Sequence, residues 1–255
     1  MAETFTVKET FTLPSKGKIY DKPVAANIEL RSMNTREEML RQSSTDRPYK
    51  LLADIIEGCI VGEKPQIKVY DMCIGDYEFL LHKLRVVTYG PEYKMTVQCP
   101  NPVCNHIETR VFNLDDLTVL DFDPEEYDHL RNIELPRTHK LVRLKIETPR
   151  MLDDIEADIK NFKKRNKTVT FDPRRLITLK TLIDTVDGNK YSDEQLETFI
   201  TELPAKDSQA LINRIDKLNG KVGLDTSFTY ECSQCGYDAT TFFRFGQEFF
   251  GPTDD

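Results

Sequence analysis

Four of the six cysteines stand in two close pairs that lie far apart in the chain. Cys99 and Cys104 enclose four residues, and Cys232 and Cys235 enclose two. Strand-like runs flank each pair, at residues 93–98 and 109–113 and at residues 228–231 and 240–244. This pattern predicts two β-hairpins whose turns carry the cysteines, the form of a zinc knuckle. Two knuckles supply four thiolates, which is the complete ligand set of a tetrahedral structural zinc site.

The residues near the pairs favour zinc but leave alternatives open. Gly236 directly follows the second pair, where a knuckle often needs a residue that accepts positive φ. A Cys₃His site that uses His106 is one alternative, and a pair of disulfides or of free thiols is another. A redox motif is disfavoured, because such motifs normally open a helix and strand-like runs flank both pairs here. Cys59 and Cys73 lie among apolar residues and are expected to be buried rather than to bind metal.

Composition and charge narrow the class of protein. Charged residues make up 31% of the 255 residues, which suits a soluble protein with exposed helices. There is no apolar run of about 18 residues, so no membrane span is expected. The N-terminus does not resemble a signal peptide, so we expect a reducing compartment, which favours metal over disulfides. The net charge of −8 disfavours general nucleic-acid binding, because a basic surface supplies most of that affinity.

The order of predicted elements is similar in the two halves of the chain. Each half begins with a Leu-Pro turn, at Leu13 and Leu135, and continues with a strand and a helix capped by Thr35 or Thr148. Further helices and a strand then lead to a cysteine pair. The predicted strands after the turns are residues 27–31 and 141–145, and the predicted helices are residues 36–41, 49–60, 76–87, 150–163, 173–186, 193–202 and 208–218. Coincidence remains an alternative, because such turns and caps are common.

These patterns predict an α+β fold of two pseudo-repeated helical and strand halves, joined by a zinc-ribbon-like site of two cysteine knuckles. The first half spans residues 1–118 and the second spans residues 119–255. If the duplication is real, each half donates one knuckle and the zinc lies on a pseudo-two-fold axis. The connector between the halves is acidic, and the only basic cluster spans residues 160–175. A solvated helix end is the simplest interpretation of that cluster, and a docking patch for an acidic partner is the alternative.

The C-terminal segment is rich in aromatic residues. Five phenylalanines fall within residues 242–252, close to the chain end, where order is usually low. We expect Phe249, Phe250 and Pro252 to contact a partner protein, with Phe245 at the margin, because exposed aromatic side chains concentrate at binding hot spots. The alternative is that these rings pack onto the protein's own core.

The sequence contains no recognisable catalytic constellation. It lacks a glycine-rich phosphate loop, a Gly-x-Ser-x-Gly motif and a His-Glu-x-x-His motif, and His82, His129 and His139 are scattered. A zinc ion with four protein ligands also has no open position for a reacting water. We therefore predict a protein that is not an enzyme.

Several short motifs occur together in a recognisable order. They are residues 13–20, 74–81, 89–93 and 113–117, the two knuckles, and the Phe-Phe-Gly-Pro tail. In these motifs the chain resembles the T4-type bacteriophage baseplate hub proteins over nearly its whole length. The first knuckle of that family is usually a shorter Cys-x-x-Cys, so the spacing between Cys99 and Cys104 departs from the pattern while keeping both sulfurs.

The resemblance implies a baseplate hub subunit or a hub assembly factor of a contractile-tailed bacteriophage. The partners would be other phage baseplate or hub proteins, without a membrane or nucleic acid, and the location would be the host cytoplasm during assembly and the virion tail baseplate. The alternative is a zinc-ribbon protein that binds nucleic acid or the transcription machinery. Such a protein needs cations on its knuckle strands, which here carry only Lys94, Arg110 and Arg244, with acidic residues beside them.

Overall fold

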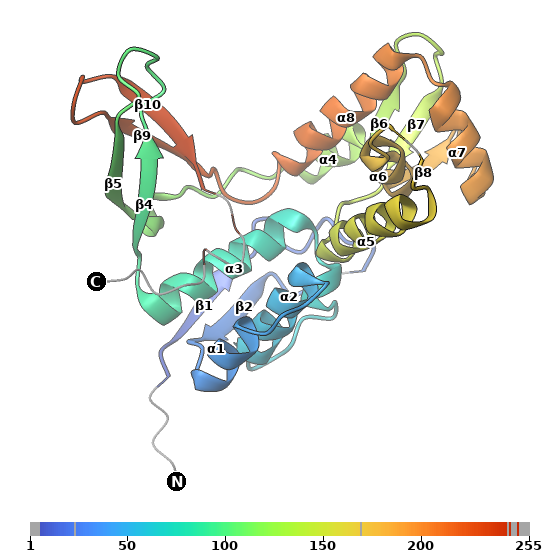
Figure 1. The fold of residues 1–255 in the computed structure, drawn as a ribbon. Helices are drawn as coiled ribbons and strands as arrows, with labels where there is room; N and C mark the ends of the chain where they lie inside the picture. Colours follow the sequence, from blue (N-terminus) through green and yellow to red (C-terminus); the bar gives the residue numbers. More distant parts are fainter. Residues whose placement is uncertain (1–5, 23, 169, 244, 246–248, 250–255) are drawn as a thin grey trace.

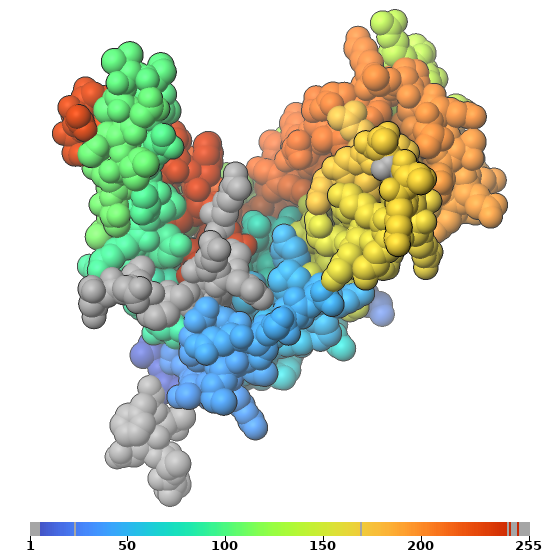
Figure 2. All heavy atoms as spheres, viewed as in Figure 1, coloured from blue at the N-terminus to red at the C-terminus, as the bar shows by residue number. Residues whose placement is uncertain are grey.

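The computed structural model describes residues 6–249 except 23, 169, 244 and 246–248. Figure 1 shows three regions: a base of helices and strands from the first half, a second group of helices and strands, and two hairpins that project together from the base. In the space-filling view the hairpins and the second group stand apart as separate projections (Figure 2). The mixture of helices and antiparallel sheets confirms the α+β class.

The first half packs three helices against a small antiparallel sheet of strand order β1-β2-β3. Its elements are β1 (Lys8–Thr12), β2 (Asn27–Arg31), α1 (Thr35–Arg41), α2 (Pro48–Cys59), β3 (Ile60–Val61), the 3₁₀ turn η1 (Val69–Asp71) and α3 (Ile74–Tyr89). Pro48 opens α2 at a position where its missing N–H costs no hydrogen bond. Leu52, Ile55, Ile56 and Cys59 recur at helical spacing, so one face of α2 is buried.

The second half has a similar antiparallel sheet, with strand order β6-β7-β8. Its elements are α4 (Pro124–Leu130), β6 (Asn132–Glu134), β7 (Leu141–Leu144), α5 (Pro149–Arg165), α6 (Arg174–Leu182), β8 (Ile183–Val186), α7 (Asp193–Glu202) and α8 (Ala205–Asn219). Thr148 caps α5 by accepting a hydrogen bond from the N–H of Met151, and Pro149 follows at the first helical position.

Each half continues into one antiparallel hairpin. The hairpin strands are β4 (Glu92–Gln98) and β5 (Ile107–Asn113), and β9 (Ser227–Glu231) and β10 (Asp238–Phe242). The register places Gln98 opposite Ile107 in the first hairpin and Glu231 opposite Asp238 in the second, so a cysteine pair lies in each turn. Both hairpins predicted around the cysteines are therefore confirmed.

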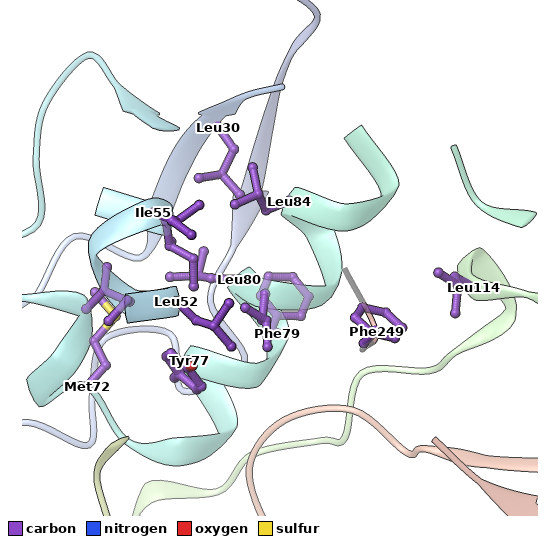
Figure 3. Close-up of a cluster of buried hydrophobic side chains, with 14 of the residues drawn as sticks. Leu30, Leu52, Ile55, Met72, Tyr77, Phe79, Leu80, Leu84, Leu114 and Phe249 are labelled. Carbon is purple, nitrogen blue, oxygen red and sulfur yellow. The ribbon is translucent and has the colours of Figure 1, made fainter. Parts of the chain in front are cut away.

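The buried side chains form two large clusters. The first cluster contains buried side chains of the base and also Phe112, Tyr230 and Phe243, which come from the two hairpins and their ends. Figure 3 shows its centre, where Leu80 and Leu84 of α3 face Leu30 and Ile55, and where Phe249 lies on the side toward Leu114. The second cluster lies in residues 122–222, with Ile19 and Cys73 added. The second hairpin thus packs on the core of the first half, and the boundary between residues 118 and 119 stays a prediction.

Two aspartates occupy matching positions in the two halves. Asp76 is the third residue of α3 and accepts hydrogen bonds from the N–H (2.9 Å) and hydroxyl (2.5 Å) of Ser15. Asp207 is the third residue of α8 and accepts from the N–H (2.8 Å) of Arg137 and the hydroxyl (2.8 Å) of Thr138. Each aspartate therefore fastens the turn after a Leu-Pro pair to the first turn of a later helix.

A contact from α5 also joins the halves. The carboxylate of Asp153 accepts hydrogen bonds from the N–H of Lys50 at 2.9 Å and from the hydroxyl of Tyr70 at 3.0 Å. Lys50 lies in the first turn of α2, where the helix leaves N–H groups without partners and favours negative charge. Asp153, which is 1% exposed, thus caps a helix of the other half.

Some element predictions were wrong in detail. Asn34, not Thr35, caps α1, because its side chain accepts from the helix backbone while Glu37 bonds back to the cap. Residues 173–186 do not form one helix, since α6 ends at Leu182 and β8 follows at once. Strand β8 pairs with β7, and that pairing satisfies its backbone groups. The sequence reading also missed β1, β3, β6 and α4.

Candidate metal centre

The two knuckle turns have the same local hydrogen bonds. The N–H of Cys99 donates to the carbonyl of His106 at 2.8 Å, and the N–H of Cys232 donates to the carbonyl of Tyr237 at 2.9 Å. The residue after each second cysteine has positive φ: Asn105 at 49° and Gly236 at 68°. Asparagine and glycine are the residues that adopt this conformation most readily. The backbone of each hairpin therefore turns sharply after its second cysteine, despite the different spacing within the pairs.

The turns bring all four thiols to one point. The sulfurs of Cys99, Cys104, Cys232 and Cys235 lie within 4.8 Å of one another. The Sγ–Sγ distance is 3.8 Å between Cys99 and Cys235 and 3.9 Å between Cys104 and Cys232, so the close contacts cross from one hairpin to the other. Cys99 and Cys232 are buried, Cys104 is half-buried and Cys235 is exposed. The cluster lies near the end of the projecting hairpins.

These distances fit a tetrahedral metal site. Four sulfurs at about 2.3 Å from a central zinc ion are separated from one another by about 3.8 Å. A disulfide instead requires sulfurs about 2.05 Å apart. All four cysteines are free thiols in the structure, so the arrangement matches a ligand set rather than two cross-links.

The electrostatics of the cluster also favour a cation. Backbone N–H groups of Gln234 and Cys235 point at the sulfur of Cys232 and lower its pKa to about 7. Burial, together with the nearby sulfurs, raises the pKa of Cys99 to about 12. Four thiols this close resist simultaneous ionisation because their charges repel. A bound divalent cation removes that conflict by stabilising every thiolate.

The other candidate ligands are not part of the cluster. In the described part of the chain, the group of side chains able to hold a metal contains the four cysteines and not His106. His106 contributes its backbone carbonyl to the first turn. Cys59 and Cys73 are buried, as expected. Burial raises the pKa of the Cys59 thiol to about 12, which keeps it neutral.

Polar contacts hold the hairpins together beside the thiols. The guanidinium of Arg110 donates to the carbonyl of Glu231, and the N–H of Ser233 donates to the carboxylate of Glu108 at 3.2 Å. The hydroxyl of Tyr230 donates to the carbonyl of Gln98 at 3.0 Å. These contacts cross between the hairpins and fix their relative position. Sequence reasoning missed them, because single polar residues on alternating strand positions do not show which strand they will face.

The aromatic C-terminal segment packs on the protein at Phe249, and the expected contact of this residue with a partner stays a prediction. Phe249 is 1% exposed, and its ring centroid lies 5.3 Å from that of Tyr93 and 5.0 Å from that of Phe245. Phe245 also packs edge-on against His82, with 6.1 Å between the ring centroids. The observed arrangement is the alternative in which the rings pack on the protein's own core. Phe250 and Pro252 lie outside the described residues.

Phe249 also lies beside a buried cation that the sequence did not point to. Arg85 is fully buried, and its guanidinium donates to the carbonyls of Gly90 and Glu92 at 3.0 and 3.2 Å. Its guanidinium carbon lies 5.2 Å from the ring centroid of Tyr89 and 5.9 Å from that of Phe249. Cation–π contacts of this kind stabilise a charge away from water. The ring of Phe249 therefore helps to stabilise the buried guanidinium of Arg85.

A comparison with protein families shows to which family the chain belongs. The model of the family described as "T4 bacteriophage base plate protein" matches residues 4–251. The chain belongs to this family. No curated protein and no solved structure matches it significantly. Within the residues the structure describes, no helix has the length and apolar character needed to cross a lipid bilayer.

The match covers both halves and both knuckles. The thiol cluster is therefore a feature of a phage baseplate protein rather than of a separate zinc-binding module. The resemblance to T4-type baseplate proteins, suggested by the short motifs, is confirmed over nearly the whole chain.

Proposed function

We propose that this baseplate protein is a non-enzymatic subunit or assembly factor of the baseplate hub, with a structural zinc ion that joins its two hairpins. The observation that carries the proposal is the convergence of four thiols from the middle and the end of the chain within 4.8 Å. Zn²⁺ would be held by Cys99, Cys104, Cys232 and Cys235. Such an ion ties distant parts of the chain together and makes its binding energy part of the folding energy.

The proposed role of the metal is mechanical rather than catalytic. A site with four cysteine ligands is closed, so no coordination position remains for water or a substrate. An isolated two-stranded hairpin is marginal in water, and cross-linking two hairpins offsets that weakness. The cross-linked hairpins would present a rigid surface to other baseplate or hub proteins, in the host cytoplasm during assembly and in the tail baseplate afterwards.

Matching elements in the two halves support this arrangement. Both halves contain a three-stranded antiparallel sheet, a Leu-Pro turn held by a helix aspartate, and a hairpin with a cysteine pair. We take residues 1–118 and 119–255 as two related units, each of which gives one knuckle to the metal. The close thiol contacts between hairpins then lie across the pseudo-two-fold axis.

A partner-binding role of the C-terminal segment depends on the position of its aromatic rings. Contact between a partner and Phe245, Phe249, Phe250 or Pro252 stays a prediction. Because the ring of Phe249 is buried, binding of a partner through this residue requires the ring to leave the core.

Two measurements test the proposed function. Elemental analysis of protein purified without added metal is expected to find about one zinc per chain. Mass spectrometry of purified virions and of infected-cell lysate distinguishes a tail subunit, present in both, from an assembly factor, present only in the lysate. A folded, fully reduced, metal-free protein contradicts the structural zinc. Absence of any assembly defect in phage that lack the protein contradicts the hub role.

A further inference from the structure

The chain carries two stretches of opposite charge and nearly equal size. Residues 111–130 contain seven carboxylates and no lysine or arginine, and residues 160–175 contain seven lysines and arginines and one carboxylate. We call them the acidic connector and the basic patch. Ion pairs of the described residues link the connector to Lys16, Lys83, Arg131, Arg143 and Lys221, and none links it to the basic patch. Each stretch therefore keeps charge that the folded chain does not neutralise with the other.

The basic patch lies at the end of α5 and the start of α6. Lys160, Lys163 and Arg174 form ion pairs with Asp46, Asp172 and Glu156. In the described structure Lys164, Arg165 and Lys167 are exposed and form no ion pair or side-chain hydrogen bond. Arg175 is also exposed and outside any ion pair, but its guanidinium donates to Ser208 and Gln209. Three cations on this surface are therefore left without a side-chain partner among the described residues. In Figure 2, α5 and α6 form the yellow surface that faces the viewer.

An exposed ring accompanies these cations. Phe171 is 58% exposed, and its centroid lies 5.9 Å from that of Phe162 on α5. The helix macrodipole favours cations within the last turn of α5. It does not account for Lys167 beyond the helix or for a phenylalanine held at the surface. Protein interfaces are enriched in aromatic residues and arginine and have a polar rim, so Phe171 and Arg165 suit an interface and the two lysines suit its rim.

The acidic connector has the complementary features. Asp116 and Glu125 are exposed and form no ion pair among the described residues. The nearest cation to Asp121 is Lys16, at 4.0 Å, and solvent screens this pair because the Asp121 side chain is fully exposed. Val119, which is 50% exposed, lies between these carboxylates. Asp123 accepts the N–H groups of Glu125 and Glu126 at the start of α4. The connector thus offers three available carboxylates around the exposed side chain of Val119.

We infer that the basic patch of one copy binds the acidic connector of a second copy. Lys164, Arg165 and Lys167 would meet Asp116, Asp121 and Glu125, and Phe171 would pack near Val119. We take the contact as head-to-tail, so that one patch and one connector stay free at the ends. Repetition of such a contact builds a ring if the rotation closes and a filament if it does not.

The composition of the patch favours a second copy over nucleic acid. Asp46, Glu156 and Asp172 lie among its cations, and these carboxylates repel a phosphate backbone. A protein surface with mixed charges accommodates them. The matching numbers of free charges in one chain supply the complementary surface directly.

Sedimentation velocity of the full-length protein tests the inference. The wild type is expected to self-associate at about 0.05 M ionic strength and to dissociate toward monomer at about 0.5 M, because salt screens exposed charges. A patch variant (Lys164→Glu, Arg165→Glu, Lys167→Glu) and a connector variant (Asp116→Lys, Asp121→Lys, Glu125→Lys) should each self-associate at least about tenfold more weakly. The matched control, Lys190→Glu with Lys206→Glu and Lys217→Glu, has the net charge of the patch variant and should associate like the wild type.

Mixing the variants gives the decisive result. The patch variant offers two acidic surfaces and the connector variant two basic ones, so an equal mixture should recover association that neither has alone. A chain that carries all six changes should also associate with itself. A wild type that stays monomeric at low salt, or association that both variants retain, overturns the inference. A monomer that binds duplex DNA through the patch also overturns it and assigns the patch to nucleic acid.

Discussion

Gly75 lies against Gly223 with backbone touching backbone, where α3 begins beside the chain segment that leads to the second hairpin. A Cβ atom on Gly75 would lie 2.1 Å from the carbonyl oxygen of Val222, and one on Gly223 would lie 3.1 Å from the Cα of Gly75. Gly223 also has φ of 122°, a conformation that residues with a side chain rarely adopt. The carbonyl of Gly223 accepts from the N–H of Leu120, so the connector is fixed at the same crossing.

We predict that Gly75→Ala destabilises the protein by about 1–3 kcal/mol or more, because the new methyl group collides with backbone that has no room to move. Gly58→Ala is the matched control. Gly58 also lies in a helix, but outside its own helix the nearest atom to an added Cβ would be a flexible Glu37 oxygen at 3.8 Å. That change should stay within about 1 kcal/mol of the wild type, on the stabilising side. Urea denaturation measures both, and equal effects contradict the tight crossing.

Local sequence signals predicted the knuckles well, and the reasons are physical. A cysteine pair between two strand-like runs has few arrangements other than a hairpin turn. Cys99 and Cys232 have 132 residues between them, and the structure brings their turns together. The proposed metal site needs this convergence, because a tetrahedral structural zinc takes four ligands. The α+β class and most helices followed from apolar spacing alone.

Other features depend on contacts that a linear pattern does not contain. Residues 183–186 continue the helical apolar spacing of α6, but pairing with β7 makes them a strand. Isoleucine, threonine and valine in this run also favour a strand. Phe249 lies near the chain end, a place that usually signals exposure, and only the neighbouring Arg85 and Tyr93 explain its burial. In the sequence, Asp76 and Asp207 look like acidic residues in the first turn of a helix, which are common. Only the structure shows that they accept hydrogen bonds from the distant Leu-Pro turns.

The proposed metal site predicts that zinc is lost when one of its four cysteines is replaced, and is kept when other candidate ligands are replaced. Cys104→Ser should reduce bound zinc from about one per chain to near zero and lower the melting temperature, because the ion stabilises the folded chain. Cys73→Ser removes a thiol outside the cluster and should leave the zinc content unchanged. His106→Ala should also retain zinc. Elemental analysis with thermal melting measures these outcomes, and zinc loss in His106→Ala would instead assign the site to three cysteines and a histidine.

The packing of Phe249 predicts a cost in stability when its ring is removed. Phe249→Ala should destabilise the protein by about 3–5 kcal/mol, as expected for a fully buried phenylalanine. Phe242→Ala, which removes a ring that is 63% exposed, should change stability by less than about 0.5 kcal/mol. Chemical denaturation compares the two. If Phe249→Ala leaves stability intact but blocks assembly of the tail, the ring acts mainly on a partner rather than in this core.

A buried histidine predicts loss of stability in acid. His82 is fully buried, its Nε2 donates to the carbonyl of Leu114 at 3.0 Å, and burial lowers its pKa from 6.5 to about 4. The folded protein therefore resists protonation that the unfolded chain accepts. This contribution to stability is fully present above the unfolded pKa of 6.5 and is lost as the pH falls toward 4, by up to about 3 kcal/mol. His82→Gln keeps a donor for Leu114 but does not titrate, so its stability should fall less in acid.

Glu78 provides a control of opposite sign. Burial, together with the charge of Glu147, raises the pKa of Glu78 from 4.5 to about 7. Its folded form holds a proton more tightly than the unfolded chain, so its contribution is fully present below pH 4.5 and is lost as the pH rises through 7. Glu78→Gln should therefore lose more stability than the wild type when the pH drops from about 8 to about 5, whereas His82→Gln should lose less. Urea denaturation of the wild type and both variants at these two pH values measures the slopes. Parallel slopes for all three proteins contradict both assignments.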